Sequence, residues 1–212
     1  MASPGILIVL EGIEGSGKTT QFRLLESWLR DAGLDVVSAR EPGGTQAGEA
    51  ARQALLHGGD VPARAELMLM LASRAALMEQ VVEPALRRGA IVLLDRFELS
   101  SFAYQGYGRG IPLEQVRAAN AVATAGRRPD RTLLLDVPGD VGVARRAAAG
   151  KAADRIEGAG HDFHERVAAG YRELARNEQG VALIDGTGTV EDVQARLRDE
   201  LRARFPETIG RT

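Results

Sequence analysis

The chain carries the stretch ILIVLEGIEGSGKTT at residues 6–20, and this stretch decides the fold. Its first part, residues 6–10, is an unbroken apolar run, which is typical of a strand buried on both faces of a parallel sheet. The part that follows matches the pattern G-x-x-x-x-G-K-S/T, in which a glycine-rich loop leads from such a strand into a helix. Together they predict an α/β fold with an anion-binding loop at the end of a strand.

The loop has the composition of a phosphate-binding P-loop. Its glycines let the backbone fold tightly with N–H groups pointing inward, and the helix that follows adds its positive N-terminal end. A lysine here reaches the β- and γ-phosphates of a nucleoside triphosphate, and the hydroxyl after it is a ligand for Mg²⁺. We therefore expect a triphosphate and Mg²⁺ to bind here. The expected binding residues are Gly12, Ile13, Glu14, Gly15, Ser16, Gly17, Lys18 and Thr19.

Apolar runs alternate with stretches of helical period along the remaining chain. Further strands are expected at 35–39, 90–94, 131–135 and 181–184. Helices are expected at 18–31, 47–56, 63–88, 113–125, 141–149, 161–177 and 190–204. Pro84 should bend the longest of them, because proline lacks the N–H that a helix needs. The pattern predicts a five-stranded parallel sheet with helices on both faces, in one domain over residues 1–212, with a lid loop at about 147–160.

Composition excludes several classes of protein. The chain has 212 residues, a net charge of −2 and no cysteine, so disulfides and cysteine-based metal sites are ruled out. The charge and the 4% aromatic content disfavour a nucleic-acid binder. No apolar run approaches the roughly 20 residues that span a bilayer, and residues 1–5 lack the basic start of a signal peptide. We expect a cytoplasmic protein with no membrane partner.

A second group of candidate residues follows the expected strands, where open α/β sheets bind ligands. Asp95 can hold Mg²⁺ through its water shell, and Arg96 can grip a phosphate with two hydrogen bonds. The alternative is a helix-capping Asp95 with a surface Arg96. Asp136 is a rival metal ligand that is more often structural. Arg40 precedes a Pro-Gly-Gly loop and suggests another anion contact, unless it is an ordinary surface arginine.

Two further sets of side chains are ambiguous on their residue types alone. Met70 and Arg74 lie four residues apart and therefore share one helix face, which is ordinarily a core methionine beside a solvated arginine. Ser101, Tyr104 and Gln105 are hydrogen-bonding groups close behind Asp95 and Arg96. Such a cluster suits a nucleobase and its sugar as well as it suits simple packing.

These motifs converge on one family. The chain resembles bacterial thymidylate kinases over nearly its whole length. The resemblance rests on the segments 11–20 (EGIEGSGKTT), 40–45 (REPGGT), 73–74 (SR), 95–97 (DRF), 100–106 (SSFAYQG) and 154–157 (DRIE). It implies a three-layer P-loop kinase fold and the reaction ATP + dTMP → ADP + dTDP with Mg²⁺, in a homodimer.

The resemblance also assigns roles to residues. Glu14 looks like the P-loop acid that faces the sugar and phosphate of the acceptor. Arg96 looks like the arginine that grips the dTMP phosphate. Arg74 looks like the side chain that reads the thymine carbonyl edge. The base and sugar pocket would contain Ser101, Tyr104 and Gln105.

The chain departs from the family pattern at two places. Many relatives have a phenylalanine that stacks on the base where this chain has Met70, whose sulfur can still pack on a ring. Relatives without a P-loop arginine usually supply one from the lid, and here that position is Ala149. Lys151 and Arg155 are then the cations expected to cover the transferring phosphoryl group. Lys151, one of only two lysines, could instead be a solvated loop residue.

Two other functions remain open on the sequence. The first is a P-loop kinase acting on a different nucleoside monophosphate, which the presence of Met70 allows. The second is a regulatory module that binds or hydrolyses a nucleoside triphosphate. A module of the GTPase type would need a base-reading motif such as Asn-Lys-x-Asp, and the sequence contains no Asn-Lys pair.

Overall fold

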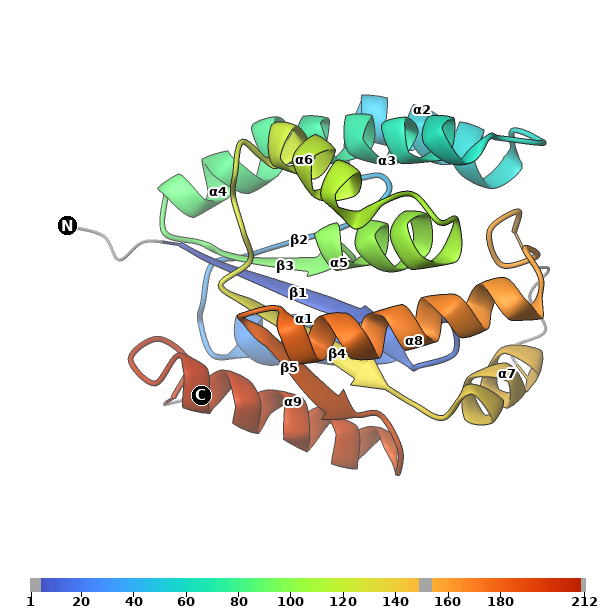
Figure 1. The fold of residues 1–212 in the computed structure, drawn as a ribbon. Coiled ribbons are helices and arrows are strands. Elements are labelled where there is room, and N and C mark those ends of the chain that lie inside the picture. Colours follow the sequence, from blue (N-terminus) through green and yellow to red (C-terminus); the bar gives the residue numbers. More distant parts are fainter. Residues whose placement is uncertain (1–4, 149–153, 211–212) are drawn as a thin grey trace.

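Five parallel strands form one sheet at the centre of the molecule, in the order β2-β3-β1-β4-β5 (Figure 1). The computed structural model describes residues 5–148 and 154–210. The strands are β1 Ile6–Gly12, β2 Val36–Arg40, β3 Ile91–Asp95, β4 Arg131–Asp136 and β5 Val181–Asp185. The predicted fold class, an α/β fold with a five-stranded parallel sheet, is confirmed.

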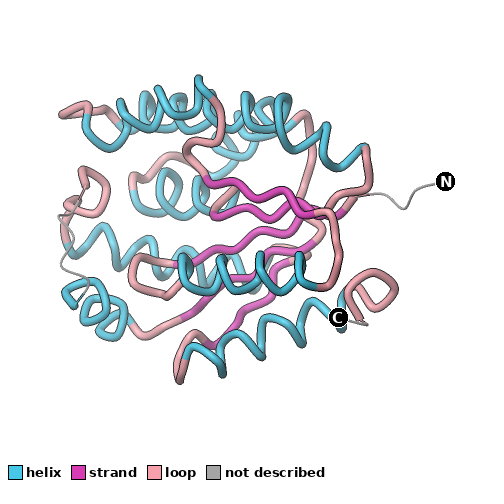
Figure 2. The backbone as a smooth tube through the Cα atoms, turned by 180° about the vertical axis from the view of Figure 1, so that it is seen from behind, coloured by secondary structure: helices cyan, strands magenta, loops and turns pink. Residues whose placement is uncertain are grey.

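Helices cover both faces of this sheet, which runs between them in Figure 2. They are α1 Lys18–Asp31, α2 Gln46–His57, α3 Ala63–Leu77, α4 Glu83–Arg87, α5 Glu98–Ser101, α6 Leu113–Thr124, α7 Gly139–Ala148, α8 His161–Asn177 and α9 Val190–Arg204. Two π-helical segments, η1 Met78–Val82 and η2 Phe102–Gly108, join α3 to α4 and extend α5.

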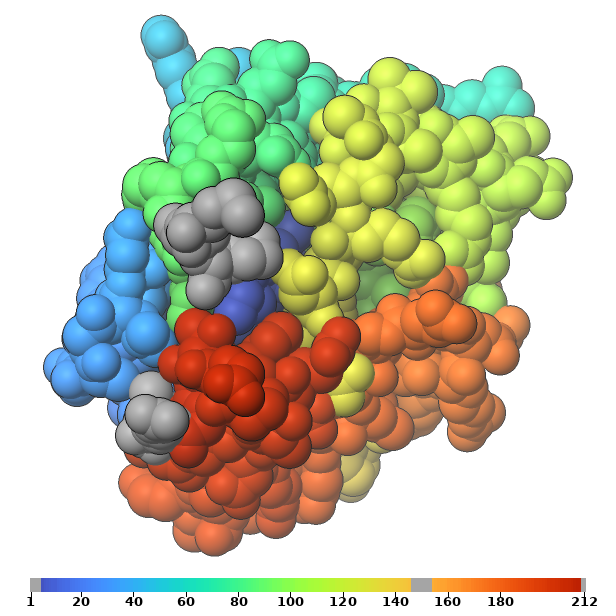
Figure 3. Space-filling view, turned by 90° about the vertical axis from the view of Figure 1, so that its left-hand side faces the viewer, coloured from blue at the N-terminus to red at the C-terminus, as the bar shows by residue number. Residues whose placement is uncertain are grey.

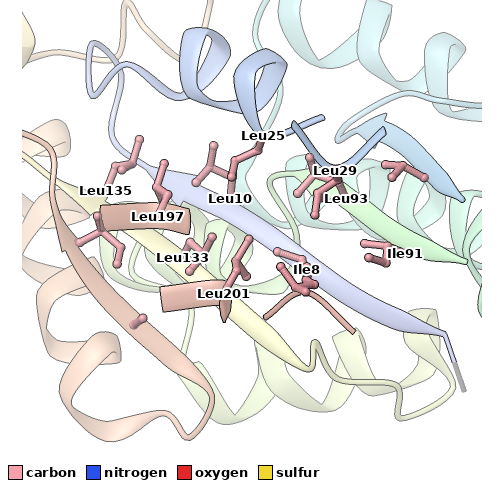
Figure 4. Close-up of a cluster of buried hydrophobic side chains, with 14 of the residues drawn as sticks. Ile8, Leu10, Leu25, Leu29, Ile91, Leu93, Leu133, Leu135, Leu197 and Leu201 are labelled. Carbon is pink, nitrogen blue, oxygen red and sulfur yellow. The ribbon is translucent and has the colours of Figure 1, made fainter. Parts of the chain in front are cut away.

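Alternate residues of the strands enter two different cores, as expected for a sheet buried on both faces. Leu10 of β1 and Leu133 of β4 point to one face, where they pack with Leu25 of α1 and Leu197 of α9 (Figure 4). Val9 of β1 points to the other face and packs against η1 and α4. These cores fix the central strand, and with it the loop that follows β1.

The long helical region expected at 63–88 is divided by a π-helical segment. The segment η1 ends at Val82, and α4 follows it with Pro84 in its first turn. A wider turn accommodates a proline, which cannot donate the usual backbone hydrogen bond.

The sequence pattern did not predict the helical segment formed by α5 and η2. This segment is glycine-containing, and it is held by packing on α8, where the Tyr104 ring meets Phe163 and Tyr171 edge-on. Tertiary contacts therefore impose a helical conformation that local propensity does not favour.

The carboxyl ends of all five strands meet at one edge of the sheet. Asp95 is in register with Leu10 of β1 and with Arg40 of β2, so three predicted site segments lie side by side. Figure 3 looks at the opposite end, where α9 and the segment leading into β4 lie on the surface. Over the described ranges, no helix has the length and apolar character that crossing a bilayer requires.

Candidate functional site

The loop between β1 and α1 has the backbone of an anion cradle. Gly15 and Gly17 have φ values of 77° and 94°, in the left-handed region that glycine adopts without strain. A Cβ on Gly15 would also overlap the carbonyl oxygen of Gly142 at the start of α7. Helix α1 begins at Lys18 with no side-chain cap and no acid in its first turn, so its N-terminal amides are open to a bound anion.

Lys18 lies folded back on the loop that precedes it. Its Nζ donates to the carbonyl oxygens of Gly12 at 2.8 Å and Ile13 at 3.0 Å. Burial lowers the pKa of Lys18 from its usual value, and the nearby positive charge of Arg96 lowers it further. The ammonium group is thus positioned over the anion cradle.

Two cavities meet at this lysine. The helical cavity lies between the P-loop, α2, α3 and η2, and the P-loop cavity lies between the P-loop, α7 and the loop before α9. Both are lined by Glu14, Lys18, Thr19, Arg52 and Glu157. A group that passes from a ligand in one cavity to a ligand in the other would cross at these side chains.

The structure brings most of the predicted site residues together. The P-loop cavity is lined by Glu14, Gly15, Ser16, Gly17, Lys18 and Thr19. The helical cavity is lined by Glu14, Lys18, Thr19, Arg40, Met70, Asp95, Arg96, Tyr104 and Gln105. Arg40 is half exposed and pairs with Glu49 at 3.0 Å.

Arg96 is held at the junction in an unusual backbone conformation. Its φ is 72°, which costs energy for a residue with a side chain and persists at sites where a constraint is needed. The guanidinium donates to Tyr171 Oη at 3.1 Å and to the carbonyl oxygen of Gly12 at 3.2 Å, and it is hydrogen-bonded to Glu14. Its plane also lies against the Tyr104 ring, 5.3 Å from the centroid.

A buried carboxylate that sequence reasoning missed supports this arginine. Glu11 is fully buried and accepts hydrogen bonds from the backbone amides of Phe97 at 2.9 Å and Ser100 at 3.0 Å, and from Tyr171 Oη at 2.8 Å. These hydrogen bonds hold the turn that contains Arg96. The signal available in the sequence was an acid inside an otherwise apolar strand.

The carboxyl group of Glu14 has a low pKa and is ionised at neutral pH. Burial alone would raise its pKa, but the positive charges of Arg96 and Lys18 and the hydrogen bond from Arg96 lower it to about 2. The Glu14 carboxylate and the Arg96 guanidinium therefore form a charged pair that lines the helical cavity.

Thr19 and Asp95 form a donor set that fits Mg²⁺. Oδ1 of Asp95 is buried without a hydrogen-bond partner among the described residues, and both side chains line the helical cavity. A carboxylate oxygen and a hydroxyl are the hard ligands that this ion prefers. The rival acid, Asp136, is instead paired with Arg172 at 3.1 Å.

Arg74 and Ser101 do not line either cavity. Both side chains are fully buried, and Arg74 donates to Glu41 at 2.8 and 2.6 Å, to Ser101 Oγ at 3.0 Å and to Asn120 at 2.7 Å. The solvated Arg74 that residue types alone favour is therefore not what the structure has. To contact a base, Arg74 would have to exchange one of these partners.

Of the two cations expected in the lid, Arg155 does not line either cavity. Arg155 donates to Glu66 of α3 at 2.7 Å and to the carbonyl oxygen of Leu55 of α2 at 2.8 Å. Lys151 and Ala149 lie outside the described residues. Two cations that sequence reasoning missed are nearer: Arg52 lines both cavities, and Arg145 of α7 lines the P-loop cavity.

Comparisons with known proteins agree with this geometry. A family model described as thymidylate kinase matches residues 10–197. The chain is 46% identical to a thymidylate kinase of a Synechococcus species, over 97% of this chain and 99% of the relative. It is also 46% identical to that of Pseudomonas putida, over 90% and 91%.

A solved structure shows the same architecture. The crystal structure of thymidylate kinase from Ehrlichia chaffeensis superposes with a TM-score of 0.77 at 29% sequence identity, covering 94% of this chain and 99% of that one. A P-loop, an arginine in contact with it where two cavities meet, and this likeness over nearly the full length lead to one conclusion: the chain belongs to the thymidylate kinase family.

Proposed function

We propose that this protein transfers the γ-phosphoryl group of ATP to dTMP, giving dTDP and ADP. The observation that carries the proposal is the meeting of the two cavities at Lys18 and Glu14, with Arg96 fixed beside them. Family membership supports the pair of substrates, because the similar proteins are thymidylate kinases.

The chain's own residues supply position and charge. The loop amides and Lys18 hold the triphosphate in the P-loop cavity, and Arg96 holds the acceptor phosphate in the helical cavity. Glu14 orients Arg96 through their ion pair. The acceptor oxygen is already ionised at neutral pH, so no residue has to remove a proton. Thr19 and Asp95 would hold Mg²⁺, which would supply positive charge to the phosphates.

Arg52 is proposed as a further cation at the junction. It lies on α2, donates to the carbonyl oxygen of Pro42 at 3.0 Å and lines both cavities. In a chain with alanine at the usual lid arginine position, this placement suits a group that stabilises the transferring phosphoryl. Lys151 remains a second candidate for that role.

The proposal extends to the base and to the assembly. Met70, Tyr104 and Gln105 line the helical cavity, and we propose that the base lies against them. A homodimer is proposed through α3 and α6, where Met68 and Val122 are 56% and 84% exposed. Because ATP and nucleoside monophosphates are cytoplasmic metabolites, we place the activity in the cytoplasm.

An assay of ADP release across possible acceptors tests the proposal. We expect turnover with dTMP to exceed that with dUMP, CMP, AMP and GMP when each is supplied with ATP and Mg²⁺. A preference for another monophosphate would support the kinase of different specificity that Met70 allows. Turnover that does not depend on any acceptor would support a nucleotide-hydrolysing module instead.

A further inference from the structure

A fully buried carboxylate is hydrogen-bonded to Gln105, beside which the base is proposed to lie. Glu66 of α3 has no solvent exposure, and each of its two carboxylate oxygens accepts two hydrogen bonds. Oε2 accepts from Arg109 Nη2 at 2.9 Å and from Arg155 Nη2 at 2.7 Å. Oε1 accepts from Arg109 Nε at 3.1 Å and from Gln105 Nε2 at 2.9 Å. Two segments far apart in the sequence, at residues 105–109 and at residue 155, therefore converge on this one side chain.

Glu66 is held in its ionised form. Burial by itself would raise the pKa of Glu66, but the hydrogen bonds from Arg109, Gln105 and Arg155 outweigh it and lower the pKa. An ionised carboxylate has no proton to donate and acts only as an acceptor. Whatever faces Oε1 must consequently present an N–H or O–H group.

This requirement fixes the orientation of the Gln105 amide. The two ends of a glutamine amide differ only in their hydrogen bonding, so the partners decide which way the group points. Because Glu66 accepts from Nε2, Oε1 of Gln105 is directed elsewhere. That oxygen is buried, has no hydrogen-bond partner in the described part of the chain, and belongs to a side chain that lines the helical cavity.

We propose that Glu66 is a positioning residue that selects the base by holding the acceptor oxygen of Gln105 toward the cavity. The inference rests on the proposed function, which seats the base beside Gln105. Thymine carries an N–H at ring position N3 and can donate to this oxygen. Cytosine carries a lone pair there, so its N3 would face another acceptor. A ligand that leaves a buried acceptor without a donor binds roughly tenfold or more weakly.

The replacement Glu66→Gln tests this directly. The oxygen of the new amide is expected at the Oε2 position, where two arginines donate to it. Its NH₂ group then takes the Oε1 position, where it loses the hydrogen bond from Arg109 Nε and faces Gln105, which must turn over to accept and so present Nε2 to the cavity. We expect the ratio of kcat/KM for dTMP to kcat/KM for dCMP to fall about tenfold, mainly through KM.

A matched control and a double-mutant cycle separate positioning from general damage. Glu114→Gln, at an exposed site on α6, should leave the ratio unchanged. Gln105→Leu should lower the ratio, and adding Glu66→Gln to it should lower the ratio no further. Additive effects of the two changes would overturn the inference, as would an unchanged ratio in Glu66→Gln.

A wrong position for the base would give a different pattern of results in these variants. If Gln105→Leu leaves the ratio intact, the base does not lie beside Gln105, and both that part of the proposed function and this inference are rejected. If Gln105→Leu lowers the ratio but Glu66→Gln does not, only the inference is rejected. If Glu66→Gln does not fold, Arg109→Gln serves instead, because it withdraws two hydrogen bonds from Glu66. A several-fold fall in the ratio supports the inference, and no change rejects it.

Discussion

The phosphate end and the base end of the site are built in opposite ways. At the phosphate end, the loop of residues 12–19 is one continuous segment, and Lys18 contacts the backbone of Gly12 and Ile13 within it. At the base end, Glu66 and Arg74 lie on α3 and Gln105 lies on η2, and the hydrogen bonds that hold them join side chains of different segments. The first is a local structure, and the second is a buried network.

This difference predicts different consequences of mutation. A local cradle can lose its charged group without losing its shape, so changes there should affect turnover more than stability. A buried network holds charges that compensate one another, and removing one of them leaves another buried and unpaired. Changes at the base end should therefore affect stability as well as specificity.

The largest effect is expected for Arg74→Met. This change removes the partner of Glu41, whose pKa is already raised because it is buried, and leaves Asn120 and Ser101 without their donor. We expect a loss of about 3–5 kcal/mol in the free energy of unfolding, measured in urea. Arg64→Met, at an exposed site on the same helix, should change it by less than about 0.5 kcal/mol. A small effect at Arg74 would contradict the contrast drawn above.

Lys18→Ala should show the opposite behaviour. We expect turnover to fall more than about 100-fold, because a charge positioned at the transferring group is lost. The free energy of unfolding should stay within about 1 kcal/mol of the value for the unsubstituted protein, since a buried ammonium with a lowered pKa stabilises the fold little. The matched control is Arg23→Ala on the exposed side of α1. Turnover like that of the original protein would remove the P-loop from the mechanism.

Arg96 joins the two ends, and two variants separate its side chain from its backbone. Arg96→Ala and Arg96→Gly should both raise the KM for dTMP and lower kcat by about tenfold or more each, with the KM for ATP little changed. Because φ is 72° at this position, the glycine variant should be about 1 kcal/mol more stable than the alanine variant. An effect confined to ATP would contradict the proposed role in acceptor binding.

The smallest effect is a pH dependence at Glu14. Its pKa falls from 4.5 to about 2 on folding, so its ionised form stabilises the protein above about pH 4.5 and this stabilisation is lost as the pH falls toward 2. Glu14→Gln should therefore be less stable than the original protein near pH 6. The two thermal unfolding midpoints should converge as the pH is lowered through that window. A constant difference at all pH values would show that the charge of Glu14 is not what stabilises the fold.

The sequence by itself determined the sheet, the P-loop and the edge at which ligands bind. Each of these depends on a short continuous pattern: an apolar run, a glycine-rich loop, or Asp95 and Arg96 at the end of a strand. Such patterns act through backbone geometry over a few residues, so one segment carries the whole signal. Helices α8 and α9 were likewise predicted with their observed bounds, because their apolar periodicity is regular.

Only the tertiary structure decided what lies around the base. It placed Arg155 against Glu66 rather than beside the P-loop, put Arg52 at the junction of the cavities, and buried Arg74 among four partners. The residues that satisfy these buried groups are separated by tens of positions in the chain. A hydrogen bond between such positions leaves no periodic mark in the sequence, because it depends on how whole helices pack and not on neighbouring residues.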